Sequence, residues 1–432
     1  MLMHRVGLYL HVPFCPSKCG YCDFYSAMPK PGDFGPLVDA LLTELNSTLQ
    51  ADDVRVETIF VGGGTPTFLP TGSLERLLAG LGRYITEDEV TEFTIETNPG
   101  IMDEDKVAIL RDHGVNRISM GAQSFHDPEL RALGRIHQPA DIAHSAELIH
   151  RAGFEHFNLD LIFGIPGQTA SSWSDSIRQA MDLDPDHLAC YGLTYEPGTP
   201  LHERLTQGQV TRMDEELEAA LYMSAIRQVS ARGFEQYEIS NFARRTYDNV
   251  DVAIRAPSAS EGSARNRQEP IACAPGPENG DTRNSPQLSR ALARPQSMCR
   301  HNLRYWHNEP GLGIGPSAAS YLAGRRWRNV ADTAQYVHRI QAGESPVSES
   351  ETLSPAQRAG ETAMLALRLN EGIIPQWFHQ MTGFDPHRLF ADPITRHKDA
   401  GMLTADLEGI ALTPQGRLVA DTIIADFLMP AM

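Results

Sequence analysis

Short runs of β-prone apolar residues alternate with longer amphipathic stretches through the first half of the chain. The short runs predict strands at Val6–Val12, Glu57–Val61, Glu92–Glu96, Asn116–Met120, His156–Leu161 and His187–Tyr191. The longer stretches repeat apolar residues at helical spacing, in Leu37–Leu49, Leu74–Leu81, Val107–Leu110, Ile142–Ile149 and Trp173–Met181. Such alternation predicts parallel strands covered by helices. Six units predict an α/β fold, a partial (β/α)6 TIM-like barrel rather than a closed eightfold one.

The pattern changes in the second half. Residues 214–231 predict a long amphipathic helix, and Gln236–Ser240 a short strand. Residues 246–298 are rich in Ser, Pro, Asn, Arg and Gly, which predicts a disordered insertion. Ser73 and Asp103 are expected to begin two of the earlier helices.

We therefore expect four parts: a barrel with its linking helix and strand (1–245), the insertion (246–298), a segment that completes the core (299–345) and a C-terminal domain (346–432). In the last part helices precede a hairpin of Leu403–Ala405 and Ile410–Leu412 around the turn Leu407–Gly409. This pattern predicts a mostly helical, winged-helix-like domain.

Charge and cysteine content narrow the class of protein. A net charge of −18 disfavours nucleic-acid binding. No run approaches about 18 uninterrupted apolar residues, so we expect no membrane span. Three of the six cysteines fall within residues 15–22, which suggests ligands rather than disulfides and therefore a reducing cytoplasm.

The three clustered cysteines, Cys15, Cys19 and Cys22, are spaced as metal ligands on one loop. Thiolates are the usual ligands of iron–sulfur clusters, and three of them leave one iron of a [4Fe–4S] cubane open. The alternative is a structural zinc site, which needs four ligands and could take His11 as the fourth. Spacing alone leaves both open.

With the aromatic Tyr21 before the last cysteine, Cys-x₃-Cys-x₂-Cys resembles the signature of the radical S-adenosylmethionine superfamily. The resemblance implies that the open iron binds S-adenosylmethionine. Other motifs follow successive predicted strands, where a barrel places its site. They include Gly62-Gly63-Gly64-Thr65-Pro66 and Glu96-Thr97-Asn98-Pro99.

Within the superfamily the chain is similar to the group of oxygen-independent coproporphyrinogen III oxidases and HemW-like haem chaperones. The resemblance implies that the residues around the cluster and S-adenosylmethionine are the three cysteines with Tyr9, Tyr21, Gly63, Gly64, Thr65, Glu96, Gln123, Arg135, Asp160 and Thr194. It assigns no catalytic residue.

Two departures from the oxidases favour the HemW-like group. The oxidases have a fourth cysteine two positions after the third, where this chain has Phe24. They also carry a long segment before the cluster, whereas here fourteen residues precede Cys15.

The segment 299–345 contains His301-Asn302-Leu303-Arg304-Tyr305-Trp306, which resembles a HemW-like motif proposed to matter for haem. Imidazole can ligate haem iron, and Tyr305 and Trp306 offer flat apolar surface. The alternative is that His301, Tyr305 and Trp306 only pack a core.

The resemblance thus implies a haem chaperone that binds haem, a [4Fe–4S] cluster and S-adenosylmethionine and delivers haem to respiratory or other acceptor proteins. It leaves a homodimer open, as well as whether radical chemistry occurs. The alternative is oxidative decarboxylation of coproporphyrinogen III.

The predicted insertion is expected to be dispensable. Deleting residues 250–295 should leave cluster and haem binding intact, because a disordered segment supports neither. Iron content and haem absorbance of the deletion variant measure this, and loss of either in a soluble variant would contradict it.

Overall fold

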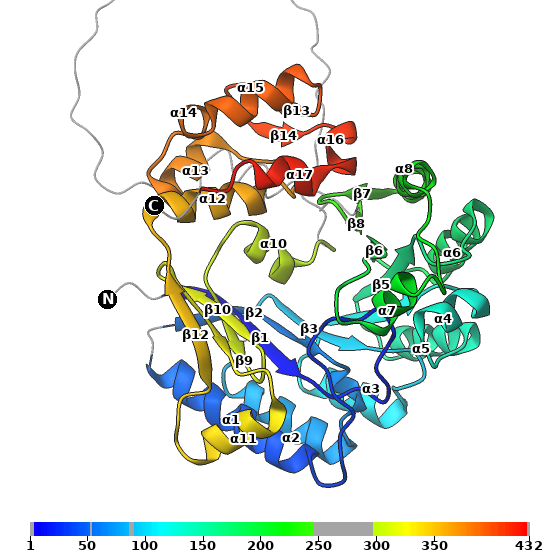
Figure 1. Ribbon diagram of the computed structural model, residues 1–432. Helices are drawn as coiled ribbons and strands as arrows, with labels where there is room; N and C mark the ends of the chain where they lie inside the picture. The colour runs from blue at the N-terminus through cyan, green and yellow to red at the C-terminus, as the bar shows by residue number, and fades with distance from the viewer. Residues whose placement is uncertain (1–3, 52–53, 86–89, 246–296, 430–432) are drawn as a thin grey trace, which may run out of the picture.

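A mixed sheet of 12 strands dominates the fold, which a computed structural model describes for residues 4–51, 54–85, 90–245 and 297–429 (Figure 1). Its order is β12-β11-β10-β9-β1-β2-β3-β4-β5-β6-β8-β7, so the sheet does not close on itself. The partial barrel predicted from the sequence is confirmed.

The centre of the sheet is parallel. It consists of β1 (His4–Val12), β2 (Val54–Gly63), β3 (Glu92–Thr97), β4 (Arg117–Gln123), β5 (His156–Phe163) and β6 (His187–Gly192). These are the six predicted strands. A further parallel strand that the sequence analysis missed, β9 (Gly311–Ile314), pairs with β1. Its four residues include two glycines, too short and too atypical a run to predict a strand.

Helices cover the outer face of the parallel strands (Figure 1). They are α1 (Phe34–Ala51), α2 (Thr71–Gly82), α3 (Glu104–Asp112), α4 (Asp127–Leu133), α5 (Pro139–Arg151), α6 (Ala170–Asp182) and α11 (Thr333–Gln341). Asp103 caps α3 as predicted, since its side chain accepts from the Lys106 N–H. Ser73 does not begin α2, which starts two residues earlier, after Pro70.

Antiparallel strands extend both edges of the sheet. On one side α7 (Pro200–Thr206) and α8 (Glu215–Ala231) lead to the hairpin β7 (Phe234–Gln236) and β8 (Asn241–Arg244). The predicted strand Gln236–Ser240 is therefore wrong, because most of it forms the turn of this hairpin. On the other side lie β10 (Ala319–Leu322), β11 (Arg325–Asn329) and β12 (Val347–Thr352).

The C-terminal residues form a mostly helical unit with one hairpin, as predicted. Its elements are α12 (Pro355–Ala366), α13 (Pro375–Thr382), α14 (Pro386–Leu389), α15 (Ala391–Asp399), β13 (Leu403–Ala405), β14 (Ile410–Leu412), α16 (Pro414–Leu418) and α17 (Ala420–Ala425). Phe378, Phe390 and Phe427 are buried in its own apolar core. The short helix α10 (Arg300–Trp306) lies between this unit and the sheet (Figure 1).

Residues 246–296 lie outside the described residues, so the predicted insertion stays a prediction. The predicted boundaries of the other three parts of the chain also stay predictions. Its last two residues, Ser297 and Met298, are described and buried. The Ser297 carbonyl accepts a hydrogen bond from Arg117 Nη1 at 3.0 Å, so these two residues belong to the packed structure and not to a disordered segment. In the described part of the chain no helix combines the length and apolarity needed to cross a bilayer.

Candidate functional site

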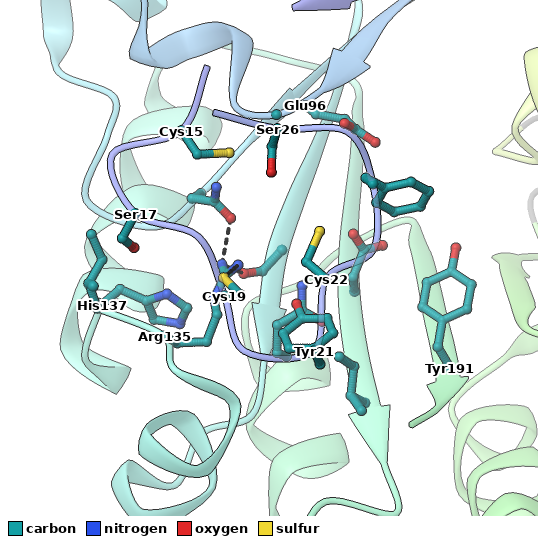
Figure 2. Close-up of a pocket in the computed structure, with 18 of the residues that line it drawn as sticks. Cys15, Ser17, Cys19, Tyr21, Cys22, Ser26, Glu96, Arg135, His137 and Tyr191 are labelled. Atoms are coloured by element: carbon teal, nitrogen blue, oxygen red, sulfur yellow. Dashed lines mark hydrogen bonds between the residues drawn. The ribbon is translucent and has the colours of Figure 1, made fainter. Parts of the chain in front are cut away.

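A cavity of about 460 Å³ opens at the carboxyl ends of the parallel strands. Figure 2 shows the three cysteine sulfurs turned inward from the loop that borders it. Except for Tyr9 and Thr65, all the predicted cluster and cofactor residues line it: Cys15, Cys19, Tyr21, Cys22, Gly63, Gly64, Glu96, Gln123, Arg135, Asp160 and Thr194. These residues come from the ends of all six central parallel strands and, for Arg135, from the turn after α4.

Backbone hydrogen bonds hold the cysteine loop in place. The Gly20 N–H donates to the Leu133 carbonyl at 2.9 Å, and the Gly20 carbonyl accepts from the Leu201 N–H at 2.8 Å. The Cys15 N–H donates to the Ala27 carbonyl at 3.1 Å, which closes the loop at its base. Because none of these bonds uses a thiol, the loop leaves all three sulfurs available to a ligand.

Tyr9 and Thr65 do not line the cavity but contact residues of the cysteine loop and its neighbours. The Tyr9 hydroxyl lies 3.0 Å from His11 Nδ1, and His11 Nε2 donates to the Tyr25 carbonyl at 2.9 Å. Thr65 Oγ1 lies 3.5 Å from Cys15 Sγ. Both nitrogens of the buried His11 are therefore engaged, which removes the proposed fourth ligand of a zinc site.

Glu96 reaches the cavity because its neighbours are glycines. Its Oε2 accepts from the Gly63 N–H at 3.0 Å. A Cβ on Gly62 would lie 2.6 Å from the same oxygen, so only glycine leaves room for the carboxylate. Gly63 has a φ of +105°, and a Cβ there would meet the His11 ring at 2.6 Å.

Asp160 provides a second carboxylate from β5. Burial raises its pKa to about 6, although the Asn158 amide opposes the shift by donating to Oδ1 at 2.8 Å. Burial also raises the pKa of Glu96 to about 7. A pair of desolvated carboxylates in one cavity favours a ligand that carries positive charge or several hydroxyl donors.

Arg135 is held by a residue that the sequence analysis quoted but did not select. Its Nη2 donates to Asn98 Oδ1 at 2.5 Å and to the Gly121 carbonyl at 2.6 Å, while Nη1 lies 3.5 Å from Cys19 Sγ. Asn98 Nδ2 in turn donates to Thr65 Oγ1 at 2.7 Å. Asn98 follows Glu96 in the same strand-end motif, and that position was the signal that could have identified it.

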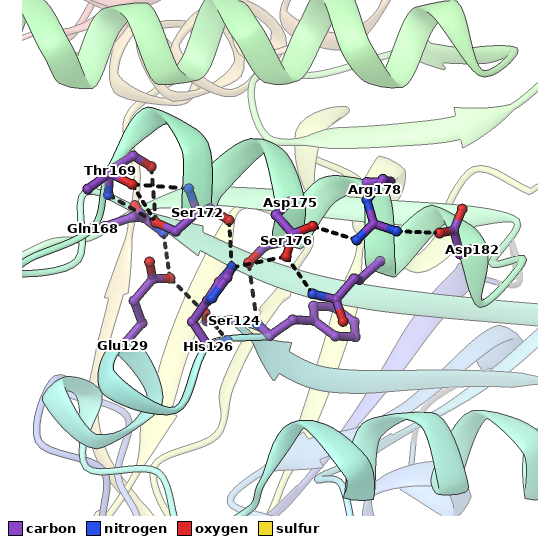
Figure 3. Close-up of polar contacts among 12 residues, drawn as sticks. Ser124, His126, Glu129, Gln168, Thr169, Ser172, Asp175, Ser176, Arg178 and Asp182 are labelled. Atoms are coloured by element: carbon purple, nitrogen blue, oxygen red, sulfur yellow. Dashed lines mark hydrogen bonds and ion pairs between the residues drawn. The ribbon is translucent and has the colours of Figure 1, made fainter.

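Gln123 occupies a strained position that the adjoining loop stabilises. Its φ is +66°, and the pairing of β4 with β5 shifts register just before it. Figure 3 shows the polar contacts that tie the following residues to α6. Ser124 Oγ donates to Glu129 Oε2 at 2.6 Å, and the Phe125 N–H donates to Ser176 Oγ at 3.3 Å. Such support is what allows a non-glycine residue to keep this backbone conformation.

The residues predicted for haem lie on α10, away from this cavity. His301 is 2% exposed; its Nδ1 lies 2.9 Å from Thr58 Oγ1 and its Nε2 3.3 Å from the Tyr305 hydroxyl. Burial lowers the pKa of His301 to about 3. The Arg368 guanidinium stacks over Trp306 at 5.0 Å. This geometry favours the packing alternative for His301 and Trp306, whereas Tyr305 lines a second cavity of about 540 Å³.

The glycine-rich segment that follows α10 does not reach the cysteine cavity. The first residues of the 311–316 segment form β9, beside β1. The Gly315 N–H donates to the buried Glu44 at 2.8 Å.

Comparison with known proteins settles the family. The radical SAM superfamily matches residues 9–180, and the HemN C-terminal domain matches residues 353–419. The haem chaperone HemW of Bacillus subtilis is 30% identical over 424 residues, which cover 97% of this chain and 98% of that protein. The chain belongs to the HemW family of the radical SAM superfamily. HemW of Mycobacterium tuberculosis is also 30% identical, over 98% of this chain and 94% of its own length.

The fold agrees with that of a solved structure. Coproporphyrinogen III oxidase (HemN) from Escherichia coli, described as a radical SAM enzyme, superposes with a TM-score of 0.76 over 99% of this chain and 91% of its own. At 20% identity this likeness establishes the fold alone.

Membership in the superfamily implies a [4Fe–4S] cluster and S-adenosylmethionine, and the donor set of the HemW-family chain fits both. In the described residues no three His, Cys, Asp or Glu side chains are grouped to hold a single ion, whereas a cubane takes each thiolate on a different iron. Burial raises the pKa of Cys22 to about 11, so its thiolate needs a cationic partner such as iron. A Cβ on Gly121 would lie 2.7 Å from Gln123 Nε2 and 3.2 Å from Asn98 Oδ1, so glycine leaves both side chains in their places at the cavity.

Proposed function

We propose that this protein is a haem chaperone that binds haem, a [4Fe–4S] cluster and S-adenosylmethionine and passes haem to respiratory or other acceptor proteins. The observation that carries the proposal is the similarity to curated haem chaperones along nearly the whole chain. The cytoplasm, where thiols stay reduced, is the proposed compartment.

In this proposal Cys15, Cys19 and Cys22 hold the cluster, and Glu96 and Asp160 accept hydrogen bonds from S-adenosylmethionine. The desolvation of both carboxylates supports a cationic ligand. When bound, the cluster supplies one electron at a time. Arg135 offsets the negative charge of the thiolates, since its guanidinium already lies against Cys19.

Phe24 supports the chaperone over the decarboxylating oxidase. It stands where the oxidases carry a further cysteine, and it is 68% exposed at the rim of the cavity. An exposed aromatic ring contributes apolar surface but no ligand or proton.

Haem itself is proposed to bind against α10, where Tyr305 lines the second cavity. The His301 ring is packed in this structure, so in this proposal haem binding exchanges the 3.3 Å contact of Nε2 with the Tyr305 hydroxyl, the longer of the two contacts of the ring, for a contact with iron.

Haem titration of the anaerobically reconstituted protein tests the proposal. We expect tight one-to-one binding by absorbance, weakened in His301→Ala and Tyr305→Phe variants. His307→Ala is the matched control, because His307 follows the same helix but pairs with Glu371. Absence of binding in the wild type would refute the chaperone function and direct attention to coproporphyrinogen turnover under nitrogen.

A further inference from the structure

A layer of polar side chains lies beneath Asp160 on the inner face of the barrel. Ser119 on β4 pairs in register with Asn158 on β5, which pairs in register with His187 on β6. The inward layers of parallel barrels are usually filled by branched apolar residues. Three polar residues side by side on neighbouring strands are therefore unusual at this place in a barrel and indicate a specific function.

In the next layer toward the carboxyl ends of the strands, the residues beside Asp160 are small. Its in-register neighbours are Gly121 on β4 and Ala189 on β6. Neither has a side chain long enough to cover the carboxylate, so Asp160 faces the cavity while its support comes from below.

Hydrogen bonding fixes the orientation of the Asn158 amide. Its Nδ2 lies 2.8 Å from Asp160 Oδ1 and 2.8 Å from Ser119 Oγ. A carboxylate only accepts, so the atom that faces it must be the NH₂ group. The Asn158 Oδ1 is then the acceptor for His187 Nδ1, at 2.6 Å.

The same reasoning fixes the tautomer of His187. Its Nδ1 carries the proton, so Nε2 accepts from the Tyr237 hydroxyl at 2.9 Å. Burial lowers the pKa of His187 well below its ordinary value, which keeps the ring neutral. The Tyr237 oxygen accepts from the Cys299 N–H at 3.3 Å, at the start of α10. In this series of hydrogen bonds, from the Cys299 N–H through Tyr237, His187 and Asn158, each donor therefore points toward Asp160.

We propose that His187 is a positioning residue that locks the Asn158 amide, so that Asp160 stays an acceptor aimed at an ammonium or ribose hydroxyl group of S-adenosylmethionine. This rests on the proposed function, in which Asp160 contacts that cofactor. Without the His187 donor, Asn158 Oδ1 loses its partner, and only the contacts with Asp160 and Ser119 hold the amide. An amide that turns over presents its oxygen to the Asp160 carboxylate, where two acceptors repel each other, so the His187 donor strengthens the preference for the observed orientation.

Two amide substitutions at His187 test the proposal, because each can reproduce the position of only one ring nitrogen. In His187→Asn the amide nitrogen can take the place of Nδ1 and keep the donor to Asn158. In His187→Gln the side-chain amide can reach only the place of Nε2, and the bond to Asn158 is lost. Both variants remove the same ring from the same buried site, so a purely structural role predicts equal effects.

The measurement is S-adenosylmethionine affinity of the anaerobically reconstituted full chain, with iron content and thermal unfolding beside it. We expect His187→Gln to weaken binding about tenfold, as for one hydrogen bond to a charged group, and His187→Asn to keep most of the wild-type affinity. Equal weakening in both variants, or no weakening in His187→Gln, would overturn the positioning role.

Asp160→Asn separates this inference from the proposed function. If Asp160→Asn leaves the affinity unchanged, the cofactor contact assigned to Asp160 is wrong and His187 has nothing to position. If Asp160→Asn weakens binding, we expect adding His187→Gln to cost nothing more, because the two residues act through one contact. Additive losses would show that His187 acts elsewhere.

Discussion

A Cys19→Ala variant is expected to emerge colourless from anaerobic reconstitution and to bind S-adenosylmethionine roughly a hundredfold more weakly, a loss of about 3 kcal/mol. Only three cysteines of the described residues line the cavity, and a cubane left with two thiolates is poorly held. The loop should keep its place, since its anchors are backbone bonds to Leu133, Leu201 and Ala27. Iron content, absorbance and cofactor titration measure the outcome.

Cys190→Ala is the matched control for this variant. Cys190 is a free cysteine buried in β6 that does not line the cavity, so its removal costs packing but no ligand. We expect it to retain iron. A Cys19→Ala protein with full iron content would refute the cluster assignment.

Replacing Gly63 by alanine should damage both the fold and the site. A residue other than glycine is strained at a φ of +105°, and the new Cβ would press on the His11 ring. His11 cannot move without breaking its bonds to Tyr9 and Tyr25. We expect a loss of about 3 kcal/mol in the free energy of unfolding, measured by denaturant titration. We also expect no measurable binding of S-adenosylmethionine by calorimetry.

Gly72→Ala provides the comparison, because nothing lies within 4 Å of a Cβ at this position of α2. Alanine there should be neutral or slightly stabilising. If Gly63→Ala unfolded at the same denaturant concentration as Gly72→Ala, the steric argument would fail.

The barrel could be predicted because β-branched and apolar residues recur along its strands. In β1, Leu8, Leu10 and Val12 alternate along one face and are all fully buried. β9 could not be predicted from its four residues, because its pairing with β1 is a tertiary contact. The β7–β8 hairpin was missed because both strands are short and their turn resembles a strand in composition.

The site could be predicted only where a motif marked it. The cysteine loop and Glu96 have local sequence signals, and the structure places them around one cavity. The hydrogen bonds that link His187 through Asn158 to Asp160 have no local sequence signal, because they depend on the register between neighbouring strands. The motif around His301 gave no sign that α10 would bury the ring against Thr58, because that contact is tertiary, and the role of His301 toward haem stays a proposal.

The position of β9 also sets an order of assembly during synthesis. Gly7 pairs with Gly311, so one edge of β1 has no partner until the ribosome has translated the chain between them. At about 5–20 residues per second that takes roughly 15 to 60 seconds. The strand that leads into the cysteine loop thus emerges long before its second neighbour, and the sheet beside this loop is completed only after residue 311 has been synthesised.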